Sequence, residues 1–398
     1  MKIHDTLVQV KENLTSNHST MSYKKIKILQ TIRQGKIGGG ESHVLDLVNE
    51  LDKERYECVV LSFTQGPMVE ILRAKGITTY VVETERPFDF TKWGEVKTIL
   101  LKEKVDIVHA HGTRANSNSF YSAKELEIPV IYTVHGWSFH PDQSRLIRKL
   151  RIFSERFLVQ QSRLTICVSE NNLAYARGLF PLTRATVVKS GVNLNKFNSS
   201  FKFKDIRASL GIQKDTVLVG YVVRMTIQKD PLTLIKAISL IPKEMNIQFL
   251  FVGDGDLKAD AIELAKELEL QSKIIFMGFR QDVPDILNAI DIYCLPSLWE
   301  GLPIGMLEAM AMRKAVIVTN IDGAKEVVVH KKNGLLVPPK NPRELANALV
   351  LLSTNQELRS VISHAAVETI SQDFNIQDAT RRIEQVYESI ITGVGIKS

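Results

Sequence analysis

Short apolar runs alternate with longer amphipathic runs along most of this chain. In the first half, runs rich in β-branched residues predict strands at 26–32, 58–63, 78–82, 105–109, 129–134, 164–168 and 186–189. In the second half, the same signal predicts strands at 217–223, 247–252, 273–277, 291–295, 315–319 and 334–337. Helical periodicity lies between most of these runs, for example at 232–240, 256–270 and 343–352. Apolar strands separated by helices are typical of parallel sheets that are covered on both faces.

A polar stretch, NLNKFNSSFKFKD at 193–205, interrupts the alternation near the middle of the chain. We therefore predict an α/β protein with two doubly wound, Rossmann-like domains that face each other across a cleft. The predicted segments are a disordered tail at 1–22, domains at 23–197 and 198–376, and a final segment at 377–398 whose helix packs back on the first domain. Open α/β sheets bind ligands beyond the carboxyl ends of their strands, so the cleft is the expected site.

Composition and charge narrow the class of protein. With 398 residues, 44% hydrophobic and 24% charged, the sequence is typical of a soluble globular protein. No apolar run reaches the ~18 residues of a membrane-spanning helix, and the polar first residues lack the apolar core of a signal peptide. Cys58, Cys167 and Cys294 lie in apolar runs without metal or redox spacing, which predicts reduced core residues of a cytoplasmic protein.

A glycine-rich segment, GKIGGGE at 35–41, follows the first predicted strand and leads into a helix. It is not a dinucleotide fingerprint, because position 43, where G-x-G-x-x-G requires glycine, is His43. The glycines still allow backbone N–H groups to approach an anion at a helix N-terminus. The alternative interpretation is a flexible turn without a ligand.

Two cations follow the first strand of the second half, in VRMTIQKDP at 223–231. Arg224 and Lys229 leave the strand end five residues apart, and Pro231 is suited to the first position of a helix. A guanidinium and an ammonium beside a helix N-terminus make a suitable diphosphate site. The alternative is a solvated loop.

Histidines recur at predicted strand ends, as His109 and His111 in IVHAHG and as His135 in YTVHGW. An imidazole can donate or accept a proton near neutral pH, so these are candidate site residues. A metal site is not predicted, because no carboxylate or cysteine lies at ligand spacing.

The segment PSLWEGLPIGMLEAMAM at 296–312 places two glutamates after another predicted strand. Glu300 lies in a loop of glycine and proline, whereas Glu308 lies in a helix that is otherwise apolar. A buried carboxylate needs partners, and vicinal hydroxyls of a ribose or sugar can supply them. The alternative is an ion pair with a neighbour such as Arg313.

A basic amphipathic helix is predicted at 144–163, with Leu146, Leu150, Phe153 and Phe157 on one stripe. The residues around this stripe include Arg145, Arg148, Lys149, Arg151 and Arg156. The helix either packs on the sheet or contacts anionic lipid headgroups.

Taken in order, these motifs resemble the family 4 glycosyltransferases, which are retaining enzymes of the GT-B fold. The resemblance covers nearly the whole chain after residue 22. Besides the Arg224/Lys229 pair and the E-x7-E element Glu300/Glu308, it includes GGGE (38–41), TVHG (133–136), VSE (168–170), SGVNLNKF (190–197), VGDG (252–255) and FMGF (276–279).

The resemblance implies a role for each matched residue. Arg224 and Lys229 are expected to hold the donor diphosphate, Glu308 the nucleotide ribose, and Glu300 the donor sugar. His111 and His135 are expected on the acceptor side, and His135, Glu300, Arg224 and Lys229 are the expected catalytic group. Further donor contacts are expected from Gly38, Gly39, Gly253, Gly278, Phe279, Gly301, Leu302, Pro303 and Ile304. Neither a metal nor a cofactor is expected.

The implied function is retaining transfer of a hexosyl or N-acetylhexosaminyl group from a nucleotide sugar, with UDP-sugars favoured. The acceptor is expected to be a glycan or a lipid-linked acceptor in the synthesis of cell-surface polysaccharide or glycolipid. Residues 23–197 form the acceptor side and 198–376 the donor side. The expected location is cytoplasmic and peripheral on the inner face of the membrane, with anionic lipid contacted through 144–163. Nucleic acid is not an expected partner.

Other functions are compatible with parts of the sequence. A GT-B nucleotide-sugar 2-epimerase shares the donor motifs but uses no acceptor. A non-enzymatic nucleic-acid binder is suggested by the pI of about 9.1, although the basic residues are spread along the chain and no aromatic-basic RNA motif appears. The missing G-x-G-x-x-G counts against a dinucleotide-dependent oxidoreductase. The sequence leaves open the donor base and sugar, the acceptor, the linkage position, the oligomeric state and a start at Met1 or Met21.

Overall fold

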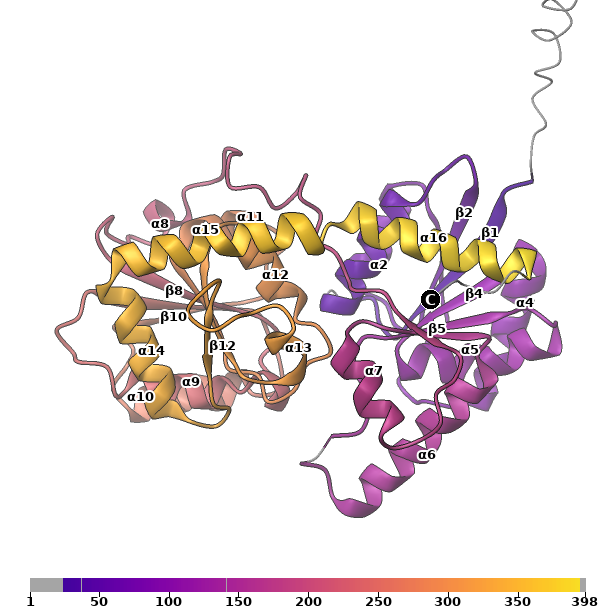
Figure 1. Cartoon of the computed structure of the whole chain (residues 1–398), viewed down its shortest axis with the longest axis horizontal. Helices are drawn as coiled ribbons and strands as arrows, with labels where there is room; N and C mark the ends of the chain where they lie inside the picture. The colour runs from indigo at the N-terminus through magenta and orange to yellow at the C-terminus, as the bar shows by residue number, and fades with distance from the viewer. Residues whose placement is uncertain (1–23, 37, 141, 394–398) are drawn as a thin grey trace, which may run out of the picture.

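The computed structural model describes residues 24–36, 38–140 and 142–393, which form two α/β domains side by side (Figure 1). The predicted tail at 1–22 lies outside the described residues. Each domain contains one parallel sheet. The first sheet has the strand order β3-β2-β1-β4-β5-β6-β7, and the second has the order β10-β9-β8-β11-β12-β13. The predicted fold class, two doubly wound sheets, is confirmed.

All thirteen predicted strands overlap strands of the structure. The first sheet consists of β1 (Ile26–Ile32), β2 (Tyr56–Ser62), β3 (Thr78–Val81), β4 (Ile107–His111), β5 (Val130–Val134), β6 (Leu164–Cys167) and β7 (Ala185–Val187). The second consists of β8 (Val217–Val222), β9 (Ile247–Val252), β10 (Ile274–Met277), β11 (Ile292–Leu295), β12 (Ala315–Thr319) and β13 (Leu335–Val337).

Helices cover both faces of each sheet (Figure 1). The first domain contains α2 (Gly39–Glu50), α3 (Pro67–Ala74), α4 (Trp93–Glu103), α5 (Thr113–Glu125), α6 (Arg145–Gln161) and α7 (Glu170–Arg177). The rest of the chain contains α8 (Ile206–Ser209), α9 (Pro231–Ile238), α10 (Lys258–Glu267), α11 (Val283–Ala289), α12 (Ile304–Ala311), α13 (Asp322–Lys325), α14 (Pro342–Thr354), α15 (Gln356–Asp373) and α16 (Ile376–Thr392). Two short 3-10 helices are η1 (Phe90–Lys92) and η2 (Ile227–Lys229).

The strands are apolar on both sides because both faces are buried. On β8, for example, Leu218 belongs to one apolar cluster and its neighbour Val219 belongs to the cluster on the opposite face. Successive side chains of a strand point to opposite faces, so a continuous apolar run is what a doubly covered sheet requires. This is why the hydropathy pattern located these strands.

Strand β4 departs from its predicted bounds of 105–109 by beginning and ending two residues later. Asp106 accepts a hydrogen bond from the backbone N–H of Lys27 at 2.8 Å through its side chain, just before the strand begins. At the other end, His111 pairs in register with Ile32 on β1 and Thr133 on β5. The ladder therefore continues through both histidines, whose polarity hid the end of the strand.

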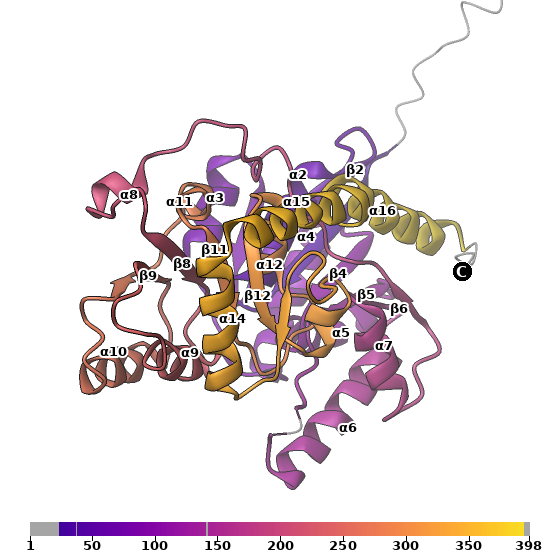
Figure 2. The same ribbon diagram turned by 60° about the vertical axis from the view of Figure 1, so that its left-hand side comes forward.

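The last helices connect the domains. Helix α15 lies over the second domain, and α16 crosses to lie over the first (Figures 1 and 2). At the crossing, Val192 and Asn375 form a parallel bridge, so two connections between the domains run side by side. Ile383 and Tyr387 of α16 are buried in the core of the first domain. The final helix is therefore part of the first domain's core.

The three cysteines lie on strands β2, β6 and β11, and all of them are free. Burial raises the pKa of the Cys58 and Cys167 thiols to about 12, and it also raises the pKa of the Cys294 thiol. Since the thiolate is the reactive form, these are inert core residues, as predicted.

Candidate active site

A cleft of about 1960 Å³ lies between the domains, and loops at the carboxyl ends of both sheets line it. Pockets for a single small ligand usually measure about 300–1000 Å³. The cleft therefore has room for two substrates at once. It lies where the topology of open α/β sheets places ligand sites.

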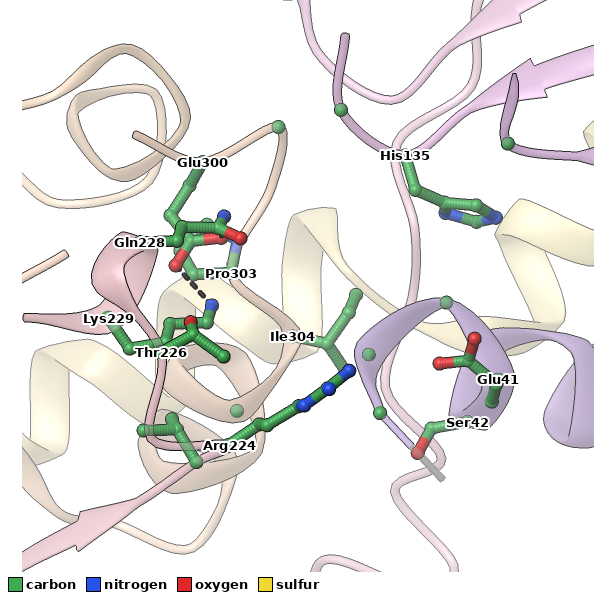
Figure 3. A pocket seen from close by; sticks show the side chains of 18 of the residues that line it. Glu41, Ser42, His135, Arg224, Thr226, Gln228, Lys229, Glu300, Pro303 and Ile304 are labelled. Carbon is green, nitrogen blue, oxygen red and sulfur yellow. Dashed lines mark hydrogen bonds and ion pairs between the residues drawn. The ribbon is translucent and has the colours of Figure 1, made fainter. Parts of the chain in front are cut away.

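Two helix N-termini meet in the cleft, one from each domain. Gly38 is the N-cap of α2, and Gly39 is its first residue. Ile304, the first residue of α12, approaches so closely that a Cβ on Gly39 would lie 3.4 Å from its side chain. Figure 3 shows this approach of the α2 loop and Ile304. Because helix N-termini carry partial positive charge, the meeting point favours an anion such as a diphosphate.

Glu41 in the first turn of α2 is a site residue that the sequence reasoning did not select. Its carboxylate is buried, and Oε1 lies 3.5 Å from Nε of Arg33. Burial raises the pKa of this carboxyl, while the charges of Arg33 and Arg224 lower it. Its position directly after the glycines, in GGGE, was the signal available in the sequence.

On the second domain, Arg224 follows β8 and faces the first domain across the cleft (Figure 3). Its side chain is 47% exposed, and its ion-pair partner among the described residues is Asp256, at 3.9 Å. Such a long, exposed contact contributes little. Arg224 is therefore available to bind an anionic ligand.

Both carboxylate oxygens of Glu300 have partners within its own domain. Its carboxylate forms an ion pair with Lys229 (Figure 3). It also accepts a hydrogen bond from Ser297 Oγ at 2.7 Å and another from Gln228 Nε2 at 3.2 Å. Only 7% of its side chain is exposed. Lys229 is thus held by Glu300, and Arg224 is the more available cation of the predicted pair.

Glu308 is different, because no side chain of the described residues donates a hydrogen bond to its carboxylate. It lies one turn into α12 and lines the cleft. Burial raises its pKa to about 7. The alternative partner, Arg313, instead hydrogen-bonds His364. An unpartnered carboxylate on a cleft wall is positioned for a ligand that donates hydrogen bonds.

We expect Glu308→Gln to raise the melting temperature relative to the wild type more at pH ~8 than at pH ~5. With the folded pKa of Glu308 raised to about 7, the folded state retains a proton that the unfolded state has already released. The associated stability is present at low pH and is lost as the pH rises through about 7. Glutamine does not titrate, so the variant keeps its stability.

Thermal melts of both proteins across this pH range measure the effect. Glu263→Gln, at an exposed position that faces Lys266, is the matched control and should follow the wild type. Parallel pH curves for wild type and Glu308→Gln would contradict the raised pKa.

The two domains touch next to Glu300. A Cβ on Gly301 would lie 1.9 Å from the carbonyl oxygen of His135, so only glycine fits there. The ring of His140 stacks on Trp299 with centroids 4.4 Å apart. Leu302 and Pro303 are buried and also line the cleft. The structure is therefore a closed arrangement in which the loop that carries Glu300 contacts the first domain.

The remaining predicted donor contacts lie after β9 and β10. Gly253 lines the cleft with φ of +135°, and a Cβ there would lie 2.1 Å from the carbonyl oxygen of Val223. Phe279 is on the cleft wall and donates its backbone N–H to Asp254 at 2.9 Å. Gly278 lies beside the Asp254 carboxylate and is not among the residues that line the cleft. Of these three predicted donor contacts, Gly253 and Phe279 therefore line the cleft and Gly278 does not.

His111 and His135 both line the cleft, whereas His109 is buried inside the first domain. His43 of α2 lies beside His111 and His135 without lining the cleft itself, and the sequence analysis did not select it because it lies far from both in the chain. Neither ring nitrogen of His43 has a hydrogen-bond partner among the described residues. Burial lowers the pKa of His43 to about 4 and those of His111 and His135 well below their usual value, so all are neutral.

The nitrogens of His43, His111 and His135 lie within 4.8 Å of one another, a spacing that could hold a metal ion. However, Nδ1 of His111 lies 3.0 Å from Nε2 of His135, a hydrogen-bond distance. A metal bound by both nitrogens would have to replace this bond. The geometry therefore fits a hydrogen-bonded imidazole pair better than a metal centre.

Comparison with known protein families gives two matches that together span most of the chain. Residues 37–196 match the model of Glycosyltransferase Family 4, and residues 202–369 match the model of Glycosyl transferases group 1. The boundary between the matches falls in the polar stretch that separates the two domains.

Several similar proteins are named glycosyltransferases. An Escherichia coli UDP-Gal:alpha-D-GlcNAc-diphosphoundecaprenol alpha-1,3-galactosyltransferase is 27% identical over 386 residues, covering 93% of this chain and 98% of that protein. A Campylobacter jejuni N,N'-diacetylbacillosaminyl-diphospho-undecaprenol alpha-1,3-N-acetylgalactosaminyltransferase is 26% identical and covers 86% of this chain and 94% of its own length. The Anabaena protein Alr3699/HepE, solved with UDP and glucose, has the same fold, with a TM-score of 0.80 and 22% identity over 92% of this chain and all of that chain.

Proposed function

Because the chain belongs to glycosyltransferase family 4 and is a glycosyltransferase, we propose that it transfers a sugar from a UDP-sugar to a lipid-linked glycan, with retention of configuration. The observation that carries the donor assignment is Glu308, a cleft carboxylate without a partner among the described residues. A ribose has the vicinal hydroxyls that such a carboxylate binds. The support lies in its position one turn into α12, in the same cleft that Arg224 lines.

In the proposed reaction, the diphosphate leaves on the face where the acceptor hydroxyl attacks. Arg224 and the N-termini of α2 and α12 stabilise the negative charge that develops on the leaving diphosphate. Glu300, held rigidly by Lys229 and Ser297, binds the donor sugar. The closed arrangement excludes water and so limits hydrolysis of the donor. No metal is required in this scheme, because cationic side chains and helix dipoles provide the positive charge.

Calorimetric and thermal-shift titrations with UDP, GDP, ADP and their sugar derivatives, all in EDTA, test the proposal. We expect one uridine nucleotide to bind and to stabilise the protein, and Glu308→Ala to abolish that binding. Stabilisation by a nucleotide with another base would assign the donor to that base instead of uridine. Binding that requires a divalent cation would overturn the metal-free scheme. Conversion of the nucleotide sugar to an epimer without an acceptor would indicate the epimerase alternative.

The proposed acceptor is a sugar joined through a diphosphate to a polyprenyl chain. The two similar proteins from E. coli and C. jejuni are named for acceptors of this kind, and this chain covers nearly all of their length. The cleft has room for such an acceptor beside the donor. We propose that the reaction takes place at the inner face of the membrane.

Helix α6 presents a surface suited to that membrane. It projects from the first domain in both views (Figures 1 and 2). Of the predicted stripe, Leu146, Leu150 and Phe153 are 69%, 61% and 73% exposed, and only Phe157 packs into the core. The acidic residue of α6, Glu155, is buried and bound by Thr113 and Tyr132. The exposed face is therefore apolar and basic, as an anionic bilayer requires.

This surface also reaches the cleft. Arg151 and Ser154 of α6 line it, on the turns adjacent to Leu150 and Phe153. An acceptor whose lipid lies in the bilayer would therefore enter the cleft directly from the membrane surface. Among the described residues, no helix is long and apolar enough to span a bilayer.

We expect replacement of Leu146, Leu150 and Phe153 by serine to weaken binding to vesicles rich in anionic phospholipid by at least ~10²-fold. Each such side chain contributes roughly 1.5–3 kcal/mol when it is buried, so three together give a large effect even if insertion is partial. Vesicle sedimentation measures the partition coefficient.

The matched control replaces three exposed apolar residues of the second domain, Val329, Leu351 and Val361, by serine. Equal losses of binding in both triple variants, or none in either, would contradict α6 docking. A concentration-dependent dimer that the α6 variant abolishes would instead assign this surface to a second copy.

A further inference from the structure

A continuous chain of hydrogen bonds connects the last helix to the histidines of the cleft. On one side, the Tyr387 hydroxyl of α16 lies 2.7 Å from Nδ1 of His109, whose Nε2 lies 2.7 Å from Oγ1 of Thr133. On the other side, Gln30 Nε2 donates to the same hydroxyl at 2.9 Å. Gln30 Oε1 then faces Nε2 of His111 at 2.8 Å, and Nδ1 of His111 faces Nε2 of His135 at 3.0 Å.

The Tyr387 hydroxyl sets the direction of the first branch. It accepts from the Gln30 amide, so its single proton is free to be donated to Nδ1 of His109. His109 is neutral, since burial lowers its pKa to about 3, and it then carries its proton on Nε2. That proton is donated to Thr133 Oγ1.

The Gln30 amide sets the direction of the second branch. Its nitrogen is used on Tyr387, so its oxygen faces His111 and can only accept. His111 therefore carries its proton on Nε2 and presents a bare Nδ1. His135 must donate to that Nδ1 from Nε2, which leaves its own Nδ1 bare. Each imidazole in the chain is thus assigned one tautomer.

We propose that Tyr387 is a positioning residue, which couples the tautomers of His111 and His135 to that of His109 through Gln30, so that His135 presents a hydrogen-bond acceptor at the cleft. An imidazole tautomer is set by the hydrogen bond on its other nitrogen. Reversing the Gln30 amide would reverse every bond of its branch, and His135 would then present a donor. The hydroxyl of Tyr387 ties this reversal to His109, because the tyrosine would then donate to Gln30 and His109 would have to move its proton from Nε2 to Nδ1 and accept from Thr133.

Among the side-chain hydrogen bonds of the described residues, the bond between Gln30 and Tyr387 joins the positions that are farthest apart in the sequence. Gln30 and Tyr387 are 357 residues apart, and the hydrogen bond between them is buried. Arg55 and Glu388 form an ion pair that also anchors α16 to the first domain. Helix α16 reaches this position directly after crossing from the second domain, so it supplies the cleft histidines with a partner from outside the first 197 residues.

The first test is ¹⁵N NMR of the histidine side chains in the full chain, with resonances assigned from single-histidine variants. We expect His109, His111 and His135 to be neutral with the proton on Nε2. In Tyr387→Phe, the amide of Gln30 loses the hydroxyl that accepts from it, and we expect His111 and His135 to become mixtures of both tautomers. Unchanged His111 and His135 tautomers in this variant would overturn the proposal, whatever its activity.

A second variant tests the direction of the hydrogen bonds between Gln30, Tyr387 and His109. In Gln30→Glu, the carboxylate can only accept, so the Tyr387 hydroxyl must donate to it. We then expect His109 to move its proton to Nδ1, which donates to the tyrosine oxygen, while His111 keeps its proton on Nε2. A His109 that stays protonated on Nε2 would show that Tyr387 does not direct the branch.

The consequence for turnover rests on the proposed function. We expect Tyr387→Phe to lower kcat about 10-fold with little change in donor KM, in line with the loss of outer partners that orient ligating histidines. The matched control is Tyr56→Phe, since Tyr56 is also buried against Tyr387, with ring centroids 5.7 Å apart, but lies outside the chain. Equal kcat values in the two variants would remove Tyr387 from catalysis. The NMR experiment tests the tautomers directly, so its result does not depend on whether a donor or an acceptor has been identified.

Discussion

Arg224→Ala should lower turnover by at least ~10²-fold, which is the usual loss when one group that stabilises transition-state charge is removed. Arg224 is the available cation of the second domain, because its ion pair with Asp256 spans 3.9 Å and its side chain is 47% exposed. Lys229 cannot replace it, since Glu300 already engages the ammonium. The loss should appear mainly in kcat, measured by release of the nucleoside diphosphate with a lipid-linked acceptor.

The control for charge and stability is Arg381→Ala, which removes an exposed arginine of α16 that is paired with Asp378. It should retain full turnover. If Arg224→Ala and Arg381→Ala both kept a normal kcat, the leaving diphosphate would have to be stabilised by other groups in the cleft.

Gly301→Ala should abolish domain closure and lower kcat by at least ~10²-fold, because a misplacement of about 1 Å at a reacting centre already costs that much. A Cβ at this position would lie 1.9 Å from the His135 carbonyl oxygen, which belongs to the opposite domain. Separating the domains relieves that clash without disturbing either core. The variant should therefore fold normally and remain open.

Small-angle scattering with bound nucleotide measures closure, and thermal melting measures stability. Gly94→Ala is the control, since a Cβ there meets nothing within 4 Å. An unchanged melting temperature with an expanded, inactive Gly301→Ala enzyme is the expected result. A compact and active variant would mean that the loop at Gly301 shifts without affecting the chemistry.

Much of the fold and part of the candidate site followed from local patterns in the sequence. Apolar runs located every strand, because both faces of each sheet are buried and each strand must be apolar throughout. Arg224 and Glu308 could be singled out because each follows a strand, and parallel strands deliver their following residues to one edge of the sheet. The residues on either side of Glu308 in the sequence are apolar, which also agrees with a carboxylate that has no side-chain partner among the described residues.

Only the tertiary structure decided which residues meet across the chain. The ion pair between Lys229 and Glu300 joins residues 71 positions apart. His135 and Gly301, which touch across the domains, are 166 positions apart. Gln30 and Tyr387, which share a hydrogen bond, are 357 positions apart. No periodicity or composition signal records such contacts, because they depend on how two domains and a crossing helix pack. The sequence by itself therefore determined the class of fold and the residues available for chemistry, and packing determined which of them act together.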